Sequence, residues 1–87
     1  MLINRSVDLG DGKYYSGQWS VQGKKHGTGK FNWPDGSHYE GEWQNDMANG
    51  WGVLVHSDGD VYTGNWKDDK AHGFGNYQHT DGAHYTG

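Results

Sequence analysis

The sequence contains no cysteine and few aliphatic side chains. Without cysteine, a disulfide scaffold, a cysteine-ligated zinc site and a cysteine nucleophile are all excluded. The same absence favours an intracellular setting, because small secreted domains usually depend on disulfides. Hydrophobic residues make up only 31% of the chain, and Ile and Leu are so scarce that a thick aliphatic core cannot form.

Basic residues are also fewer than acidic residues. Seven Lys and Arg residues face eleven Asp and Glu residues, which gives a formal net charge of −4. This balance disfavours binding to nucleic acid or to an anionic membrane through general electrostatics. No apolar run has the length of a transmembrane segment, and the first residues lack the apolar stretch of a signal peptide.

Aromatic residues and glycine are abundant and recur in one order. Aromatic residues reach 15% of the chain, and there are 16 glycines. The central unit, residues 39–61, has the order Tyr-x-Gly-x-Trp, a polar loop, Gly-x-Gly, a short strand pattern and Asp-Gly. The interval from Tyr15 to Tyr39 is 24 residues, and the intervals to Tyr62 and Tyr85 are 23 each. A fixed period of this length predicts a stack of units that contact their neighbours.

Each unit alternates between two faces, as β-strands do. In the first unit Tyr15, Gly17 and Trp19 share one face, while Ser16 and Gln18 share the other. We expect each unit to be a hairpin, with two-residue Asp-Gly turns linking one hairpin to the next. The predicted fold is all-β, an elongated, single-layer, twisted antiparallel meander of hairpins. We divide it into a strand or cap at 1–10 and a repeat domain at 11–87, with units at 15–38, 39–61, 62–84 and a truncated unit at 85–87.

Glycines are predicted to share the face that carries the aromatic rings. A glycine leaves a gap in a pleated surface, and a neighbouring ring can lie flat in that gap. Because glycine inside a strand costs conformational entropy, its recurrence at fixed positions indicates that ring packing offsets the cost. The structural glycines expected from the pattern are Gly17, Gly27, Gly29, Gly41, Gly50, Gly52, Gly64, Gly73 and Gly75.

The histidines do not predict a metal site. His26 and His72 hold one repeat position, and His56 and His79 hold another. Equivalent positions in neighbouring hairpins lie about 9.5 Å apart, which is too far for two ligands of one zinc ion. We therefore expect these side chains to pack or to form hydrogen bonds at strand ends, with no bound metal.

Catalytic and cofactor sites are not expected either. Glu40 and Glu42 could form the carboxylate pair of a glycosidase, but a solvated strand face is the simpler interpretation. Asp58 and Asp60 have no calcium-binding loop around them, and the Asp of each Asp-Gly pair is better interpreted as a turn former. Each Gly-x-Gly lacks the helix that a dinucleotide site requires. The prediction is a protein that is not an enzyme and has no cofactor.

The recurring order closely resembles the MORN repeat (membrane occupation and recognition nexus), over Asp11 to Gly87. Asn49 stands where His26 and His72 stand in the other units, and the first loop is one residue longer. The resemblance implies a single-layer, often curled antiparallel sheet with aromatic rows on one face. Members occur in radial-spoke and other ciliary proteins, in cytoskeletal scaffolds, in junctophilins, and beside catalytic domains of lipid kinases and a methyltransferase. In these proteins the repeats bind, space or dock.

The aromatic rows are the expected protein-binding surface. They could serve only as the core, but one face of a single-layer sheet must pack on something, and curvature covers part of it. Tyr and Trp are also favoured anchors of binding surfaces. The residues predicted for this face are Tyr15, Trp19, Tyr39, Trp43, Tyr62, Trp66 and Tyr85.

The expected function is that of a non-catalytic scaffold that docks other proteins. The resemblance suggests a cytoplasmic setting and a cytoskeletal or ciliary assembly, such as a radial spoke of the axoneme. One alternative is a module that associates with phosphoinositide membranes, with weak contact to acidic lipid through its few lysines. Another alternative is an accessory repeat region of a larger enzyme such as a lipid kinase.

Overall fold

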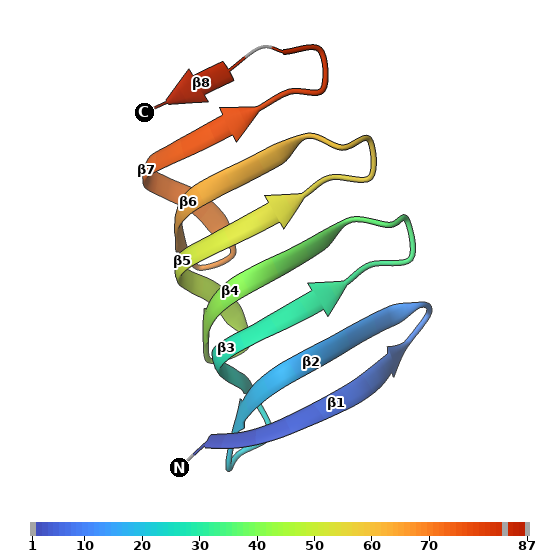
Figure 1. The fold of residues 1–87 in the computed structure, drawn as a ribbon. Helices are drawn as coiled ribbons and strands as arrows, with labels where there is room; N and C mark the ends of the chain where they lie inside the picture. Colours follow the sequence, from blue (N-terminus) through green and yellow to red (C-terminus); the bar gives the residue numbers. More distant parts are fainter. Residues whose placement is uncertain (1, 83, 87) are drawn as a thin grey trace.

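The computed structural model describes residues 2–82 and 84–86, with side chains up to residue 82, and forms one antiparallel sheet (Figure 1). Its eight strands lie side by side in chain order, from β1 at one edge to β8 at the other. They are β1 (Leu2–Gly10), β2 (Lys13–Ser20), β3 (Lys25–Asn32), β4 (His38–Gln44), β5 (Met47–Val55), β6 (Val61–Lys67), β7 (Lys70–Gln78) and β8 (His84–Thr86). The described residues include no helix, and the predicted all-β meander is confirmed.

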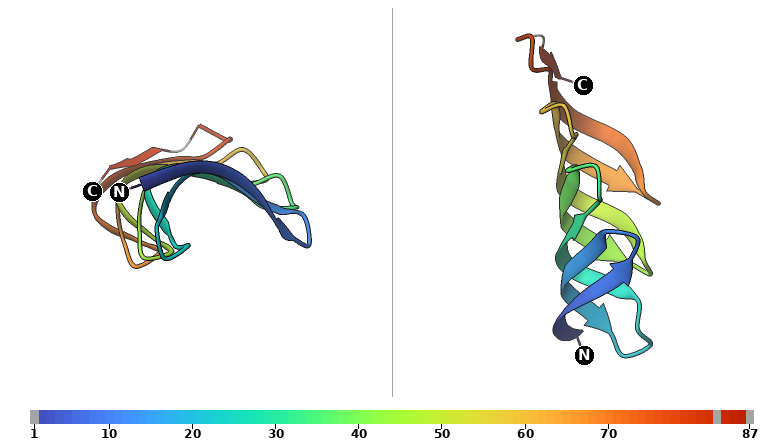
Figure 2. Two further views of the ribbon diagram at one scale, coloured as in Figure 1. Left: turned by 90° about the horizontal axis from the view of Figure 1, so that it is seen from below. Right: turned by 90° about the vertical axis from the view of Figure 1, so that its right-hand side faces the viewer.

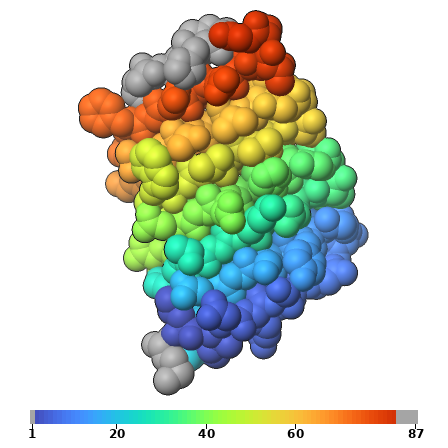
Figure 3. All heavy atoms as spheres, in the orientation of Figure 1, coloured from blue at the N-terminus to red at the C-terminus, as the bar shows by residue number. Residues whose placement is uncertain are grey.

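The sheet is a single layer whose strands curve along their length. Figure 2 shows the strands following an arch, so that one face is concave and the other convex. Its extents are 41 × 27 × 16 Å. In the space-filling view the chain forms successive bands, each strand against the next (Figure 3). A curled single layer of this kind shelters one face without needing a second sheet.

The N-terminal segment is a regular strand of the sheet. We expected residues 1–10 to form a short strand or a cap, and β1 occupies nine of them. It pairs with β2 in antiparallel register, with Ile3 opposite Trp19 and Val7 opposite Tyr15. Val7 packs against the buried core, so β1 extends the repeat sheet by one strand.

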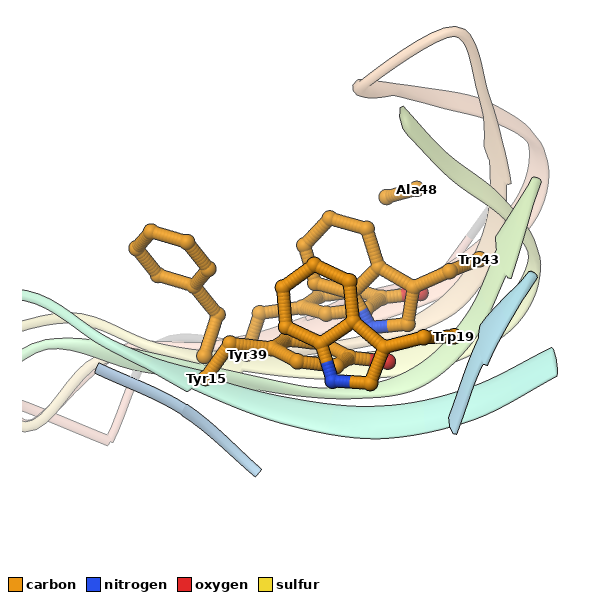
Figure 4. Packing of buried hydrophobic residues seen from close by; sticks show 6 residues of the cluster. Tyr15, Trp19, Tyr39, Trp43 and Ala48 are labelled. Carbon is orange, nitrogen blue, oxygen red and sulfur yellow. The ribbon is translucent and has the colours of Figure 1, made fainter. Parts of the chain in front are cut away.

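The sheet bends at an irregularity in each repeat. The pairing of β2 with β3 shifts between Gly17 and Trp19, and corresponding shifts follow Gly41 and Gly64. Extra residues in one strand of a pair bend that strand and increase its twist. The strands therefore curl toward the face that carries the tyrosine rings, as the ribbon around the rings makes visible (Figure 4).

Three glycines at this bend do not hold rings, which corrects the role expected for them. Gly27, Gly50 and Gly73 have φ values of +94°, +97° and +72°, a left-handed conformation that L side chains rarely adopt. A β-carbon on Gly27 would meet Gln18, and one on Gly50 would meet Glu42, not an aromatic ring. These glycines are needed for the backbone conformation of the bend.

The prediction that two-residue Asp-Gly turns link the hairpins holds only at Asp11-Gly12, which alone joins β1 to β2 with both φ values positive. Between β3 and β4 the chain makes a longer turn over residues 33–37, in which the Gly36 amide donates to the Trp33 carbonyl at 3.1 Å. Asp35 does form the turn, because its carboxylate accepts a hydrogen bond from the Ser37 amide at 2.8 Å. The same arrangement recurs at Asp58, which accepts from the Asp60 amide.

Two further tight connections lie inside the second and third repeats, where we expected polar loops. Asn45 and Asp46 alone join β4 to β5, and Asp68 and Asp69 alone join β6 to β7. All four have positive φ, between 50° and 71°. Two consecutive left-handed residues form the type I′ turn that suits a twisted hairpin, and Asn and Asp tolerate this conformation better than most residues.

Candidate functional site

The tyrosine and tryptophan rings form one interleaved column on the concave face. Ring centroids are 4.9 Å apart for Tyr15 and Trp19, 5.4 Å for Tyr15 and Trp43, and 5.1 Å for Tyr39 and Trp43. The column continues through Trp66, and the ring planes stay close to perpendicular throughout. Edge-to-face packing of this kind adds about 0.5–1.5 kcal/mol per pair beyond area burial. The two expected rows are therefore a single packed column (Figure 4).

Hydrogen bonds to backbone carbonyls fix each ring of the column. The hydroxyls of Tyr15 and Tyr39 donate to the carbonyls of Gln18 and Glu42, at 2.9 and 3.0 Å. The indole of Trp43 donates to the Gly29 carbonyl at 3.1 Å. Among the described residues, no buried side-chain nitrogen or oxygen atom lacks a hydrogen-bond partner. The column is thus a satisfied and ordered core.

Six of the predicted glycines make room for this core. A β-carbon on Gly29, Gly52 or Gly75 would overlap the ring of Tyr15, Tyr39 or Tyr62. A β-carbon on Gly17, Gly41 or Gly64 would overlap the backbone of the glycine opposite it in the next strand. Rings therefore lie flat on bare backbone, and neighbouring strands approach closely beneath them.

Burial removes most of the predicted binding residues from the surface. Tyr15 is 0% exposed, Tyr39 2%, and Trp19 and Trp43 are 6% each. These four residues form the core, which corrects their expected role as direct protein contacts. Tyr62 and Trp66 are partly buried, and the side chain of Tyr85 lies outside the described residues.

Burial also keeps the core phenols neutral. It raises the pKa of Tyr15 to about 12. It raises the pKa of Tyr39 as well, and the carboxylates of Glu42 and Asp69 add to that shift. Both hydroxyls therefore stay protonated to a higher pH than an exposed tyrosine would, and each donates a hydrogen bond to the backbone.

A groove of about 370 Å³ lies on the concave face above the ring column. This volume falls within the roughly 300–1,000 Å³ typical of ligand pockets. Its apolar lining comes from Phe31, Trp33, Tyr39, Trp43, Ala48, Leu54 and Trp66. Its charged lining comes from Lys25, Asp46 and Asp69. The groove combines an aromatic floor with charge of both signs, an arrangement that can bind a chain segment or a side chain.

The lysine of the groove is held in an aromatic cage. The Lys25 ammonium lies 5.3 Å from the centroid of Trp43, 5.5 Å from that of Phe31 and 5.9 Å from that of Tyr15. It also lies 3.6 Å from the Asp46 carboxylate, and the Lys25 side chain is only 15% exposed. A cation over several ring faces is attracted by their negative faces. We call Tyr15, Phe31, Trp43 and Asp46 the first-repeat cage.

The same aspartates also hold the hairpins together. Asp46 accepts a hydrogen bond from the Lys25 amide at 2.7 Å, and Asp69 accepts one from the Ala48 amide at 2.7 Å. Each aspartate belongs to the turn of the next hairpin along the chain. These bonds link neighbouring repeats. They also hold the carboxylates of Asp46 and Asp69 at the groove.

Large apolar side chains are exposed on the opposite face, which was not predicted as a binding surface. Trp51 is 52% exposed and Phe74 is 79% exposed. Each is the middle residue of a Gly-x-Gly, so strand alternation from Gly52 and Gly75 places it on the convex face. The position of these two side chains on the convex face could have been predicted from the alternation in the sequence. The involvement of Lys25, Leu54 and Asp69 in the groove could not, because it depends on the curl.

Two of the histidines and one of the paired acids form local contacts within the sheet. The His79 ring nitrogen lies 2.8 Å from the Asp60 carboxylate, and His26 accepts a hydrogen bond from the Asn45 amide at 3.4 Å. Glu42 accepts one from the Trp51 amide at 2.8 Å. Across residues 2–82, no three acidic or histidine side chains gather as a metal site would require. The described part of the chain also lacks a helix long and apolar enough to cross a membrane.

Comparisons with known proteins agree with the repeat architecture. The sequence model of the MORN repeat matches residues 15–38, 39–61 and 62–84, which confirms the resemblance. Curated relatives include Alsin from Rattus norvegicus, Mus musculus and Homo sapiens, each 45% identical over 38 residues. That stretch is 44% of this chain and 2% of each Alsin. The chain thus matches a small part of these relatives.

Proposed function

We propose that this chain, which belongs to the MORN repeat family, is a non-catalytic scaffold module that docks another protein in its concave groove. The main observation that supports this proposal is the groove of about 370 Å³, whose aromatic floor is not covered by a second sheet. Aromatic side chains are the favoured anchors of protein interfaces. We place this docking in a cytoskeletal or ciliary assembly, such as a radial spoke, on the family resemblance.

The ring column supports this proposal by making the groove rigid. Its rings are packed edge to face and tied to backbone carbonyls, as at Tyr39 and Trp43. A preformed surface loses little conformational entropy on binding, and this saving favours affinity. The core residues therefore hold the groove in a fixed shape, while Trp33, Leu54 and Trp66 line its surface.

The phosphoinositide alternative has weaker support. A basic patch contributes roughly 1 kcal/mol per free cation near an acidic membrane. Lys25, one of the few lysines, is directed into its own aromatic cage and toward Asp46. Binding to vesicles with phosphatidylinositol bisphosphate that weakens with added salt would favour this alternative over protein docking.

Two matched variants test the docking proposal. Leu54 lines the groove, and its neighbour Val53 lies on the opposite face of the same strand. Leu54→Glu and Val53→Glu therefore place the same charge on the two faces of β5. Circular dichroism and melting curves first establish that both variants fold.

The readout is retention in the detergent-insoluble cytoskeletal fraction of ciliated cells. We expect the wild type and Val53→Glu to be retained and Leu54→Glu to be released. Retention of Leu54→Glu with release of Val53→Glu would place docking on the convex face and contradict the proposal. Release of all three proteins would contradict the cytoskeletal setting.

A further inference from the structure

Equivalent positions of the first and second repeats both line the groove, so their side chains can be compared directly. Lys25 in the first repeat and Ala48 in the second occupy the same place, because Lys25 pairs with Trp19 and Ala48 pairs with Trp43. The amide of each donates a 2.7 Å hydrogen bond to the aspartate of the next turn. The backbone at the two positions is therefore equivalent, and only the side chain differs.

The second repeat has the walls of a cage but no lysine in it. Tyr39 stands where Tyr15 stands in the first repeat, Leu54 where Phe31 stands, and Trp66 where Trp43 stands. The centroids of Tyr39 and Trp66 are 5.2 Å apart, close to the 5.4 Å of Tyr15 and Trp43. We call Tyr39, Leu54, Trp66 and Asp69 the second-repeat cage.

The groove opens where the lysine is missing. In the first repeat the side chain of Lys25 occupies its cage and is 15% exposed. In the second repeat the residue is Ala48, which has no atoms beyond the β-carbon to fill the equivalent space. Ala48, Leu54, Trp66 and Asp69 all line the groove of about 370 Å³. The groove thus borders the position of Ala48, which is itself 4% exposed and corresponds to the lysine of the first repeat.

The second-repeat cage also lacks a positive charge. Asp46 forms an ion pair with Lys25 at 3.6 Å, whereas Asp69 forms no salt bridge within the described part of the chain. The negative charge of Asp69 acts on the cage, because it contributes to the raised pKa of Tyr39. The site therefore offers the Asp69 carboxylate and the partly buried ring of Trp66, both complementary to a cation, while Tyr39, which is 2% exposed, lies beneath them.

We propose that the second-repeat cage binds a lysine side chain of the docked protein, in the position that Lys25 occupies in the first-repeat cage. A neutral alkyl chain would fill the space but would leave Asp69 without a cation. A quaternary ammonium could lie over the rings but has no N–H to donate to the carboxylate. The inference rests on the proposed docking function and specifies what the partner presents to the groove.

The test uses this chain of 87 residues and a blocked amino acid as the probe. Nα-acetyl-lysine N-methylamide is titrated while the indole N–H signal of Trp66 is followed by NMR. The matched neutral probe is Nα-acetyl-norleucine N-methylamide, which has no ammonium group. We expect the lysine probe to shift the Trp66 signal in a saturable way, at concentrations where the norleucine probe leaves it unchanged.

Three variants connect the signal to the cage. Trp66→Leu keeps an apolar side chain but removes the ring, and it should weaken binding about five- to thirtyfold, with the Trp43 indole as the reporter. Asp69→Asn keeps an oxygen for the Ala48 amide, removes the charge and should weaken binding about two- to fivefold. Ala48→Met fills the cage with a neutral chain and should abolish saturable binding. A melting curve confirms that each variant folds.

Two outcomes would overturn the proposal. One is an equal response to the lysine and norleucine probes, which would make the cage merely apolar. The other is a response to phosphocholine at lower concentration than to the lysine probe, which would assign the cage to a quaternary ammonium. The titration contains no partner protein. A failed titration with normal cytoskeletal retention therefore overturns the lysine assignment alone, and lost retention with a normal titration overturns the docking function.

Discussion

The ring of Tyr39 lies on the bare backbone of Gly52, so closely that a β-carbon on Gly52 would overlap both the ring and its hydroxyl. The hydroxyl then reaches the Glu42 carbonyl at 3.0 Å, which keeps the polar end of a buried side chain satisfied. The same relationship recurs at Tyr15 and Gly29. Through this contact between a tyrosine ring and glycine backbone, a chain with few aliphatic side chains forms an ordered core.

The contact predicts that Gly52→Val is strongly destabilising. The added side chain must displace the Tyr39 ring or bend the strand, and overpacking of this kind costs more than ~1 kcal/mol. Thr63→Val, on the other face opposite Val53, should change the free energy of unfolding by less than about 0.5 kcal/mol. Urea denaturation measures both. Equal unfolding midpoints for Gly52→Val and the wild type would disprove the contact.

The turn aspartates give a second prediction. Asp69 has a φ of +69° and accepts the Ala48 amide, so Asp69→Ala loses a hydrogen bond and strains the turn. We expect a loss of about 1–3 kcal/mol in the free energy of unfolding. Asp69→Asn keeps both the acceptor and the tolerance for positive φ, and it should stay close to the wild type. Thermal melting of the two variants would contradict this explanation if they were equally unstable.

Alkaline pH should weaken the fold through Tyr15. Burial raises its pKa from 10.0 to about 12, so the folded state favours the neutral phenol. A raised pKa contributes stability that is complete below pH 10 and is lost as the pH rises toward 12. In Tyr15→Phe, which keeps the ring, the melting temperature should fall less between these pH values. An equally steep fall in this variant would rule out Tyr15 as a cause.

Acid should act on the turn between β5 and β6 through Asp60. The Thr80 amide donates to this carboxylate at 2.9 Å, and His79 lies 2.8 Å away; both lower the pKa of Asp60 below its usual 3.8. A lowered pKa contributes stability that is complete above 3.8 and is lost as the pH falls through the folded-state value. Asp60→Asn should flatten the acid side of the melting profile. A profile parallel to that of the wild type would show that Asp60 does not contribute.

The repeat period and the alternation of faces made the sheet predictable. Tyr-x-Gly-x-Trp places its ring residues and glycine on one face whatever the twist, because side chains alternate along a strand. The position of the tight turns was not predictable by the same means. Asp-Gly is the stronger turn signal, and it forms a two-residue turn at Asp11-Gly12. The other type I′ turns form at Asn45–Asp46 and Asp68–Asp69, where the pairing of the two strands leaves only two residues between them.

The candidate site was less accessible to sequence reasoning, because it depends on curvature. The pattern identified Tyr39 and Trp43 as important, but it could not tell a surface row from a column that the curl buries. It also gave no sign that the Lys25 ammonium lies over the Trp43 ring. Burial and cation contacts require the three-dimensional arrangement of neighbouring repeats.

The most direct measurement compares Ala48→Lys with Ala48→Met by thermal melting. The lysine variant recreates Lys25 one repeat later, over Tyr39 and Trp66 and beside Asp69. Cation–ring contacts contribute about 0.5–2 kcal/mol, so Ala48→Lys should melt above both the wild type and Ala48→Met. If Ala48→Lys melts at or below Ala48→Met, the second-repeat cage is not complementary to lysine and the central claim is contradicted.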